Sequence, residues 1–259
     1  SEVNFRKACA AVRAGRLGEI KSFEVLIPPN SRHCAAAWRE EPVPAGFDYN
    51  SWLGPAPWAP YTAQRCHYSF RFIKDYALGQ ITNWGVHYID IAHWMMGPDA
   101  VVTGIKGHGE FPTAGLFNTA TRVDVTFEFS TGAKLRCKTR TDGVVDGALR
   151  VEGTAGSMDV NRSVLKPSRV DMLEGVDEST ILGSSETNHM RDFITSMRTR
   201  KPPVAEITAG HRSTTTCILG HMAMSVARPL AWDAAAERFI TDEVANRMLA
   251  PSMRGPWKL

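Results

Sequence analysis

The sequence lacks the features of a membrane protein or a nucleic-acid-binding protein. It has no run of about 18 apolar residues, so no helix is expected to span a membrane. The first twenty residues mix charges with alanine and contain no apolar core of a secretory signal. The 30 Lys and Arg nearly balance the 27 Asp and Glu, and the basic residues are scattered. We therefore expect neither a membrane nor a nucleic acid as a partner.

Signatures of cofactor and metal binding are also missing. No G-x-G-x-x-G follows a predicted strand and no G-x-x-x-x-G-K-[ST] occurs, so no cofactor-binding residues are predicted on this chain. The cysteines are odd in number, widely spaced and never in a C-x-x-C pair: Cys9, Cys34, Cys66, Cys137 and Cys217. This pattern predicts reduced, mostly buried thiols, and neither a disulfide framework nor a cysteine-rich zinc site.

What is present is an ordinary globular composition, with 259 residues of which 43% are hydrophobic. A chain of this length can bury a substantial core. Periodicity predicts helices over 2–14, 83–96, 186–200, 206–227 and 241–250, strands over 22–27 and within 101–160, and a long aromatic loop over 28–80. Strands followed by helices, without regular βαβ alternation, indicate an α+β fold with an open, mainly antiparallel sheet and helices packed on one face. We expect one domain over 1–259.

The clearest hairpin joins the alternating apolar segments 123–129 and 135–139. Matching their apolar faces places Phe129 opposite Leu135. In that register acidic residues of one strand face basic residues of the next, and the expected pairs are Glu128 with Arg136 and Asp124 with Arg140. A second hairpin is expected around 154–156.

The densest group of polar and aromatic residues lies in 65–68 and 79–93. Asn83 and His87 are four residues apart, so they share a face if the segment is helical. An imidazole beside an amide at the first turn of a helix can bind and orient a hydroxyl or carbonyl, and histidine suits acid–base chemistry near neutral pH. The alternative is structural: Asn83 as an N-cap and His87 as a core histidine.

A metal site at this segment is disfavoured by its spacing. His87 and His93 are six residues apart, about 240° around a helix, so they face different ways. Asp90, between them, is expected to hydrogen-bond a loop or a ring nitrogen. We therefore predict no metal.

Arg65 and His67 lie in the aromatic loop just upstream. Loop charges are usually solvated, but a loop folded over the helix start would bring both residues to His87. Sugar sites combine an aromatic platform with Arg, His and Asn for the hydroxyls. This combination favours a small carbohydrate as the ligand. Trp84 is expected to belong to the core or to the pocket wall.

At this point the sequence resembles a known family. Residues 79–90, GQITNWGVHYID, resemble the G-G-x-x-x-D-x-G-x-H-x-x-D segment of the glucose–fructose oxidoreductase, inositol dehydrogenase and rhizopine-catabolism (Gfo/Idh/MocA) family. Residues 16–20, 52–58, 152–157 and the end of the chain from 232 to 259 agree in order. The resemblance covers essentially the whole chain, and its specificity rests on the order of these motifs.

The resemblance implies the C-terminal domain of an NAD(P)-dependent oxidoreductase that acts on a sugar, polyol or glycoside. In that family NAD(P) binds an N-terminal Rossmann domain, and neither its glycine fingerprint nor the family's E-K-P segment with the catalytic lysine occurs here. We expect truncation rather than a natural relative without that domain. The chain alone is then expected to be inactive. We expect a cytoplasmic location, or a periplasmic one if a leader sequence was removed together with the missing N-terminal domain.

The resemblance also implies roles for individual residues. His87 matches the histidine near the reacting carbinol, and it must perform any proton transfer by this domain. Asn83 replaces the usual Asp, so it can hydrogen-bond a hydroxyl but cannot serve as a carboxylate base. Arg65, His67 and Trp84 are the candidate substrate-binding residues. The family often pairs subunits through the free sheet face, so we expect a homo-oligomer.

A second hypothesis is a carbohydrate-binding or oligomerisation module without redox chemistry. The missing cofactor fingerprint favours it for this chain, whereas the Asn83–His87 pair favours an enzyme for the parent protein.

Overall fold

The computed structural model describes residues 2–30, 37–144, 146–181, 188–250 and 253–257. Its centre is a nine-stranded sheet. The strands lie in the order β7 (Leu165–Pro167), β6 (Gly156–Val160), β5 (Ala148–Gly153), β1 (Ile20–Ile27), β4 (Lys134–Thr139), β3 (Arg122–Phe129), β2 (Val102–Glu110), β8 (Leu230–Asp233) and β9 (Arg238–Phe239). β1 pairs parallel with β4, and the other pairings are antiparallel.

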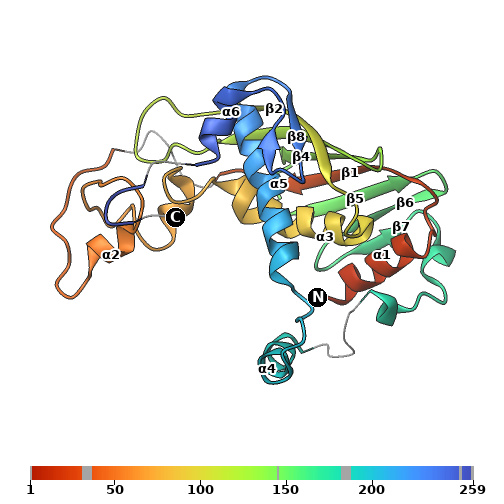
Figure 1. Cartoon of the computed structure of the whole chain (residues 1–259). Helices are drawn as coiled ribbons and strands as arrows, with labels where there is room; N and C mark the ends of the chain where they lie inside the picture. The colour runs from red at the N-terminus through yellow and green to blue at the C-terminus, as the bar shows by residue number, and fades with distance from the viewer. Residues whose placement is uncertain (1, 31–36, 145, 182–187, 251–252, 258–259) are drawn as a thin grey trace.

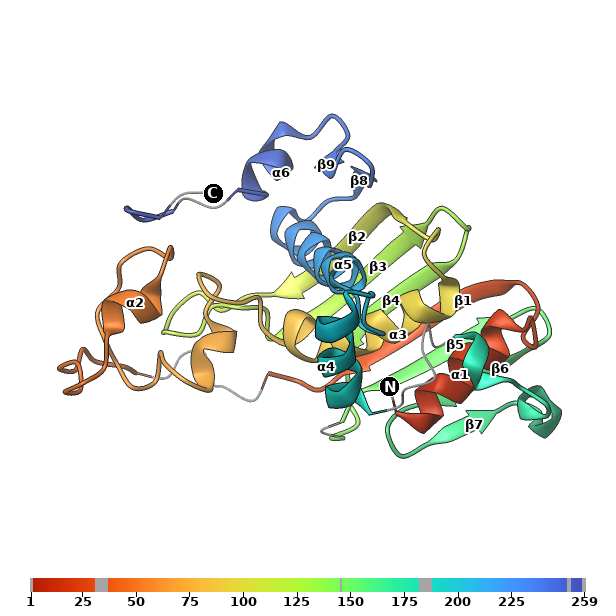
Figure 2. The ribbon, with the colours of Figure 1, turned by 60° about the horizontal axis from the view of Figure 1, so that its bottom comes forward.

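The α-helices are α1 (Val3–Arg13), α2 (Tyr49–Leu53), α3 (Val86–Met96), α4 (His189–Thr199), α5 (Ile207–Val226) and α6 (Glu243–Met248). Short helical turns of other types occur at Ser69–Phe72, Ile81–Gly85, Val170–Leu173 and Glu178–Thr180. α1, α3 and α5 lie across one face of the sheet (Figures 1 and 2). The predicted α+β class with a mainly antiparallel sheet is confirmed.

The core lies between these helices and the sheet because the strands alternate. In β1, Phe23, Val25 and Ile27 are buried while the residues between them are partly exposed. β3 and β4 show the same alternation. Since successive side chains point to opposite faces, the second face carries the charged residues. There Arg136 Nε donates to Asp124 Oδ1 at 2.8 Å, and Lys138 lies 2.6 Å from Glu24.

The predicted register of the β3–β4 hairpin is wrong by two residues. Leu135 lies opposite Phe127, and Phe129 pairs with Ala133. Gly132, with φ +83°, allows a three-residue turn, which is tighter than the connection that was predicted. The ion pairs that form are Glu128 with Lys134, which lie opposite each other, and Asp124 with Arg136, which lie on a diagonal. The second hairpin, β5 with β6, forms as predicted.

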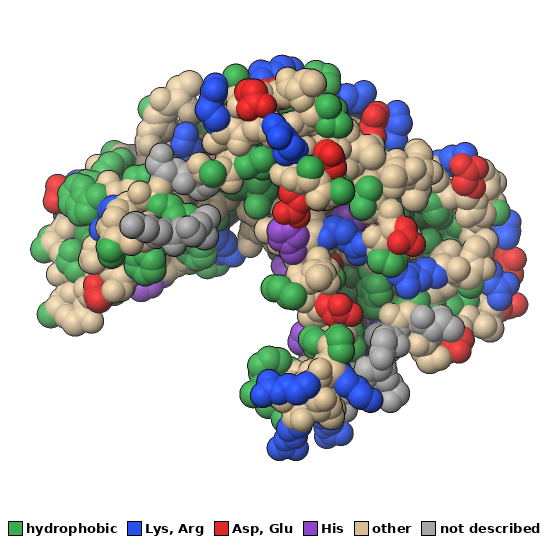
Figure 3. All heavy atoms as spheres, in the orientation of Figure 1, with side chains coloured by type: hydrophobic (Ala, Val, Ile, Leu, Met, Phe, Trp, Pro, Cys, Tyr) green, Lys and Arg blue, Asp and Glu red, His purple; other side chains and the backbone are tan. Residues whose placement is uncertain are grey.

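α4 stands apart from the sheet. Its predicted apolar stripe exists, but the stripe is exposed in the structure: Met190 (69%), Phe193, Ile194 and Met197. In the space-filling view this helix projects from the body with Lys and Arg side chains gathered at its end (Figure 3). The first two residues of the predicted helix, 186 and 187, lie outside the described ranges.

The predicted aromatic loop forms a lobe around α2. Tyr49, Leu53, Tyr61 and Cys66 are buried together there, with Trp52 and Tyr76 packed against them. Figure 1 shows α2 well away from the sheet. The lobe therefore has a core of its own, built from aromatic rings.

Two further findings concern the thiols and the membrane. Cys9, Cys66, Cys137 and Cys217 are free and buried, as predicted, while Cys34 lies outside the described residues. Burial raises the pKa of the Cys137 thiol to about 12. Within the described part of the chain, no helix combines the length and the apolar character that crossing a membrane requires.

Candidate functional site

The segment 79–90 begins with a tight turn and a widened helical turn. Gly79 has φ +73°, and a Cβ there would lie 2.5 Å from Thr119 Oγ1, so a larger residue would not fit. The chain then forms a π-helical turn at Ile81–Gly85 before α3 begins. Such turns are rare and are frequent at functional sites. The turn lies where the sequence predicted the start of an ordinary helix.

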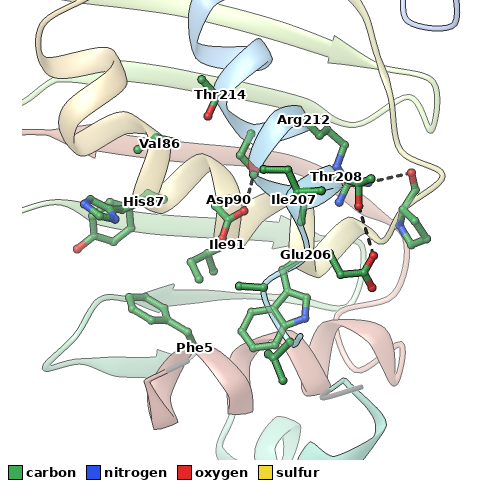
Figure 4. Close-up of a pocket in the computed structure, with 18 of the residues that line it drawn as sticks. Phe5, Val86, His87, Asp90, Ile91, Glu206, Ile207, Thr208, Arg212 and Thr214 are labelled. Atoms are coloured by element: carbon green, nitrogen blue, oxygen red, sulfur yellow. Dashed lines mark hydrogen bonds between the residues drawn. The ribbon is translucent and has the colours of Figure 1, made fainter. Parts of the chain in front are cut away.

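A pocket of about 920 Å³ opens between α1, α3 and the N-terminal end of α5. Figure 4 shows His87 and Phe5 at one side of this pocket and Glu206, Thr208 and Arg212 at the other. Its volume is within the range of small-molecule sites. We refer to it as the α1–α3–α5 pocket.

His87 stands at the mouth of this pocket, and its side chain is exposed. It is therefore not a core histidine, as the structural alternative required. Its ring meets the Trp84 ring edge-on, with centroids 6.4 Å apart. Partial burial and the nearby Arg162 lower the pKa of His87, while Asp90 opposes that shift. The imidazole is thus neutral at pH 7 and can accept a proton.

Arg162 and Asp90 line the pocket together with His87, whereas Trp84 contacts His87 and Arg162 without lining the pocket. The guanidinium of Arg162 lies 5.4 Å from the centre of the Trp84 ring, in a cation–π contact. Asp90 accepts a hydrogen bond from Ser213 Oγ at 2.6 Å, which ties α3 to α5. Trp84 therefore contacts Arg162 as well as His87.

Asn83 does not line the pocket, because hydrogen bonds hold its side-chain amide elsewhere. Arg71 Nη1 donates to Asn83 Oδ1 at 3.1 Å, and Asn83 Nδ2 donates to Gln80 Oε1 at 3.0 Å. Gln80 in turn donates to the Pro29 carbonyl at 2.7 Å. The loop arginine that reaches Asn83 is thus Arg71, which the sequence analysis did not single out and which no motif marks.

Arg65 and His67 are likewise placed away from His87. Arg65 is 5% exposed and donates to the Pro60 carbonyl at 3.1 Å, within the aromatic lobe. His67 packs on Phe47, with ring centroids 5.9 Å apart. Neither residue lines the α1–α3–α5 pocket. Of the five predicted site residues, the structure brings together only His87 and Trp84.

The described residues contain no cluster of metal ligands. Among them, no three His, Cys, Asp or Glu side chains gather where they could hold a metal ion. The sheet's neighbouring strands are joined mostly by hairpins, whereas a dinucleotide pyrophosphate is usually held at the glycine turn of a βαβ unit.

Comparison with known proteins defines the class. The model of an oxidoreductase family's C-terminal alpha/beta domain, GFO_IDH_MocA_C2, matches residues 33–259. The chain therefore belongs to the Gfo/Idh/MocA oxidoreductase family, through that C-terminal domain. This finding confirms the resemblance seen in the sequence. No curated protein sequence matches the chain.

Solved structures share the fold at low identity. The WlbA dehydrogenase of Bordetella pertussis, in complex with NADH and UDP-GlcNAcA, is 15% identical with a TM-score of 0.60, and the match covers 90% of this chain and 61% of that one. The aldose–aldose oxidoreductase of Caulobacter crescentus, complexed with glycerol, is 12% identical with a TM-score of 0.57, covering 89% and 61%. The chain thus spans about three fifths of these proteins.

Proposed function

We propose that this chain is the substrate-binding domain of an NAD(P)-dependent oxidoreductase that acts on a sugar, polyol or glycoside. The family match supports the reaction class, and the position of His87 at the mouth of the α1–α3–α5 pocket carries the assignment of the site. NADH, UDP-GlcNAcA and glycerol in the two similar structures agree with this substrate class. NAD(P) would bind a separate domain, and we expect the chain alone to be inactive.

His87 is proposed as the acid–base residue. Oxidation of a carbinol requires the hydroxyl to lose its proton, and reduction requires the proton to return. A neutral imidazole at the pocket mouth can accept that proton, and neither ring nitrogen of His87 hydrogen-bonds another described residue. Asn83 is proposed to position this end of the site through Arg71 and Gln80, rather than to touch the substrate.

The test is a turnover measurement in the protein that joins this chain to a cofactor-binding domain. His87→Ala should reduce kcat by about 10²–10⁴-fold. His189→Ala is the matched control, because His189 is exposed on α4 and does not line the pocket. Unchanged kinetics for His87→Ala would refute the assignment.

A carbohydrate-binding module without redox chemistry is the second candidate. The observation that favours it is Asn83, an amide engaged by Arg71 and Gln80 where the family usually has a carboxylate. This second function would be supported if the chain bound a sugar but showed no turnover when joined to any cofactor-binding domain.

We also propose a homo-oligomer formed through the charged sheet face. The ion pairs Asp124–Arg136 and Glu24–Lys138 give that face complementary charges that a second copy can meet. Sedimentation velocity at micromolar concentration should show a dimer or larger species whose population falls as salt rises. A strict monomer would contradict this proposal.

A further inference from the structure

Arg162 lines the α1–α3–α5 pocket and contacts the Trp84 ring, which also meets His87. It lies in the turn between β6 and β7, and hydrogen bonds hold the backbone of this turn. Asn161 Oδ1 accepts hydrogen bonds from Ser163 N and Val164 N at 2.9 and 2.7 Å, and Asn4 Nδ2 of α1 donates to the Arg162 carbonyl at 3.2 Å. The backbone therefore holds the Arg162 side chain over Trp84, beside His87.

The guanidinium has unused hydrogen-bonding capacity. An arginine carries five N–H donors, yet among the described residues none of those of Arg162 donates within hydrogen-bond distance. Its ion pair with Asp146 is long, 3.6 Å from Nη1 to Oδ1, and both side chains are about two-fifths exposed. Asp146 Oδ1 already accepts from Gly147 N at 2.8 Å.

The other two arginines of the pocket are engaged differently. Arg13 Nε donates to the Trp94 carbonyl at 2.9 Å, and Arg212 Nη1 donates to the Pro98 carbonyl at 2.9 Å. Asp90, the acid closest to His87 on α3, is paired with Ser213. Arg162 is therefore the pocket arginine for which no side-chain hydrogen bond to a described residue is found, whereas Arg212 keeps only a buried Nε without a partner. Arg162 also lies close to His87, the proposed acid–base residue, through their shared contact with Trp84.

We propose that Arg162 binds a carboxylate of the substrate, so that this site takes an acidic sugar, a uronate or its glycoside. The inference rests on the proposed function and adds the substrate's charge to it. The planar fork of a guanidinium matches the two oxygens of a carboxylate, and such pairs are among the stronger hydrogen-bonded contacts. The bound carboxylate also offsets the charge of Arg162 at His87, so the imidazole gains proton affinity when substrate arrives.

The experiment measures binding of matched sugars to the 259-residue chain by calorimetry. D-glucuronate and D-glucose differ in the carboxylate, and the UDP derivatives of both form a second pair. In the wild-type chain the acidic sugar of each pair should bind at least about tenfold more tightly. Arg162→Met should remove that preference, and Arg162→Lys should keep part of it. Arg122→Met, at an exposed arginine of β3 paired with Glu110, is the control.

A second readout follows the His87 ring by NMR titration. Saturating glucuronate should raise the pKa of His87 in the wild-type chain. In Arg162→Met the pKa should already be raised in the free chain and should not respond to the sugar. Circular dichroism of each variant checks that the fold is kept.

The outcomes separate this inference from the proposed function. Equal binding of glucose and glucuronate, or a preference that survives Arg162→Met, would overturn the role of Arg162 while a sugar site remains. Tighter binding of glucose 6-phosphate than of glucuronate would indicate that Arg162 recognises a phosphate, and this result would also overturn the proposal. Binding of no sugar at all would overturn both proposals.

Discussion

Acid should destabilise this protein through two buried histidines before its carboxylates are affected. His93 is 1% exposed, its Nε2 lies 2.9 Å from Thr216 Oγ1, and Nδ1 has no hydrogen-bond partner among the described residues. Burial and the charge of Arg212 lower the pKa of His93 to about 3. Burial and Lys74 lower the pKa of His221 to about 4. Both residues are therefore neutral in the folded state at pH 5.

The sign and size of the effect follow from proton linkage. In the unfolded chain each histidine has a pKa near 6.5, so the unfolded state binds more protons below that pH and folding stability falls. Between pH 7.5 and pH 5 each residue should cost about 2 kcal/mol of unfolding free energy. Lowered carboxyl pKa values, such as that of Asp142, matter only below about pH 4. The change in unfolding free energy between pH 6.5 and pH 5 therefore reflects protonation of the histidines.

The assay is urea unfolding at pH 7.5 and pH 5.0. In His93→Gln, which can still hydrogen-bond Thr216, the loss of stability between the two pH values should be about 2 kcal/mol smaller than in the wild type. His221→Gln should behave in the same way. His108→Gln, at an exposed histidine, should lose as much as the wild type. If His93→Gln loses the full wild-type amount, the histidine is not neutral in the folded state and the argument fails.

Two further predictions concern packing and the C-terminal tail. Gly220→Ala in α5 would place a Cβ 2.8 Å from Phe127 Cζ, so it should destabilise the fold by about 1–3 kcal/mol. Gly210→Ala in the same helix meets open space and should stabilise the fold by up to about 1 kcal/mol. Thermal unfolding measures both variants, and equal effects would contradict the close approach at Gly220. Arg254 donates to Asn50 Oδ1 at 2.7 Å and to backbone carbonyls of the aromatic lobe. Arg254→Ala should therefore speed hydrogen exchange in α2 but not in the sheet, and uniform exchange rates would argue against an anchoring role.

The sheet could be predicted from sequence because each strand buries one face. In β3 the apolar residues from Val123 to Phe129 alternate with polar ones, and the structure buries that series. The register could not be predicted from the same pattern, since a slip of two residues keeps every side chain on its face. Charge did not distinguish the alternatives either, because both registers place a basic residue opposite Asp124 and another opposite Glu128.

The site was only partly predictable for a different reason. His87 belongs to a helix, and its position follows from the helix and the strands beneath it. Arg65 and Arg71 belong to the aperiodic lobe region, where no repeat relates sequence position to direction. Arg162 lies in a hairpin turn that reaches the pocket only because the sheet brings β6 next to α1. Such long-range placement has no local signal.

The central position of β1 has a consequence for how the chain folds. β1 lies between β4 and β5, so its hydrogen-bonding partners are residues 134–139 and 148–153, more than a hundred positions later. Hairpins β3–β4 and β5–β6 can form from neighbouring segments of the chain. β1, which lies between β4 and β5, can pair only after both of these strands have been made. Closing so large a loop is entropically costly, and such topologies fold slowly. During synthesis β1 therefore remains an unpaired apolar strand until most of the chain has been made, which is a stage at which chaperones can be expected to act.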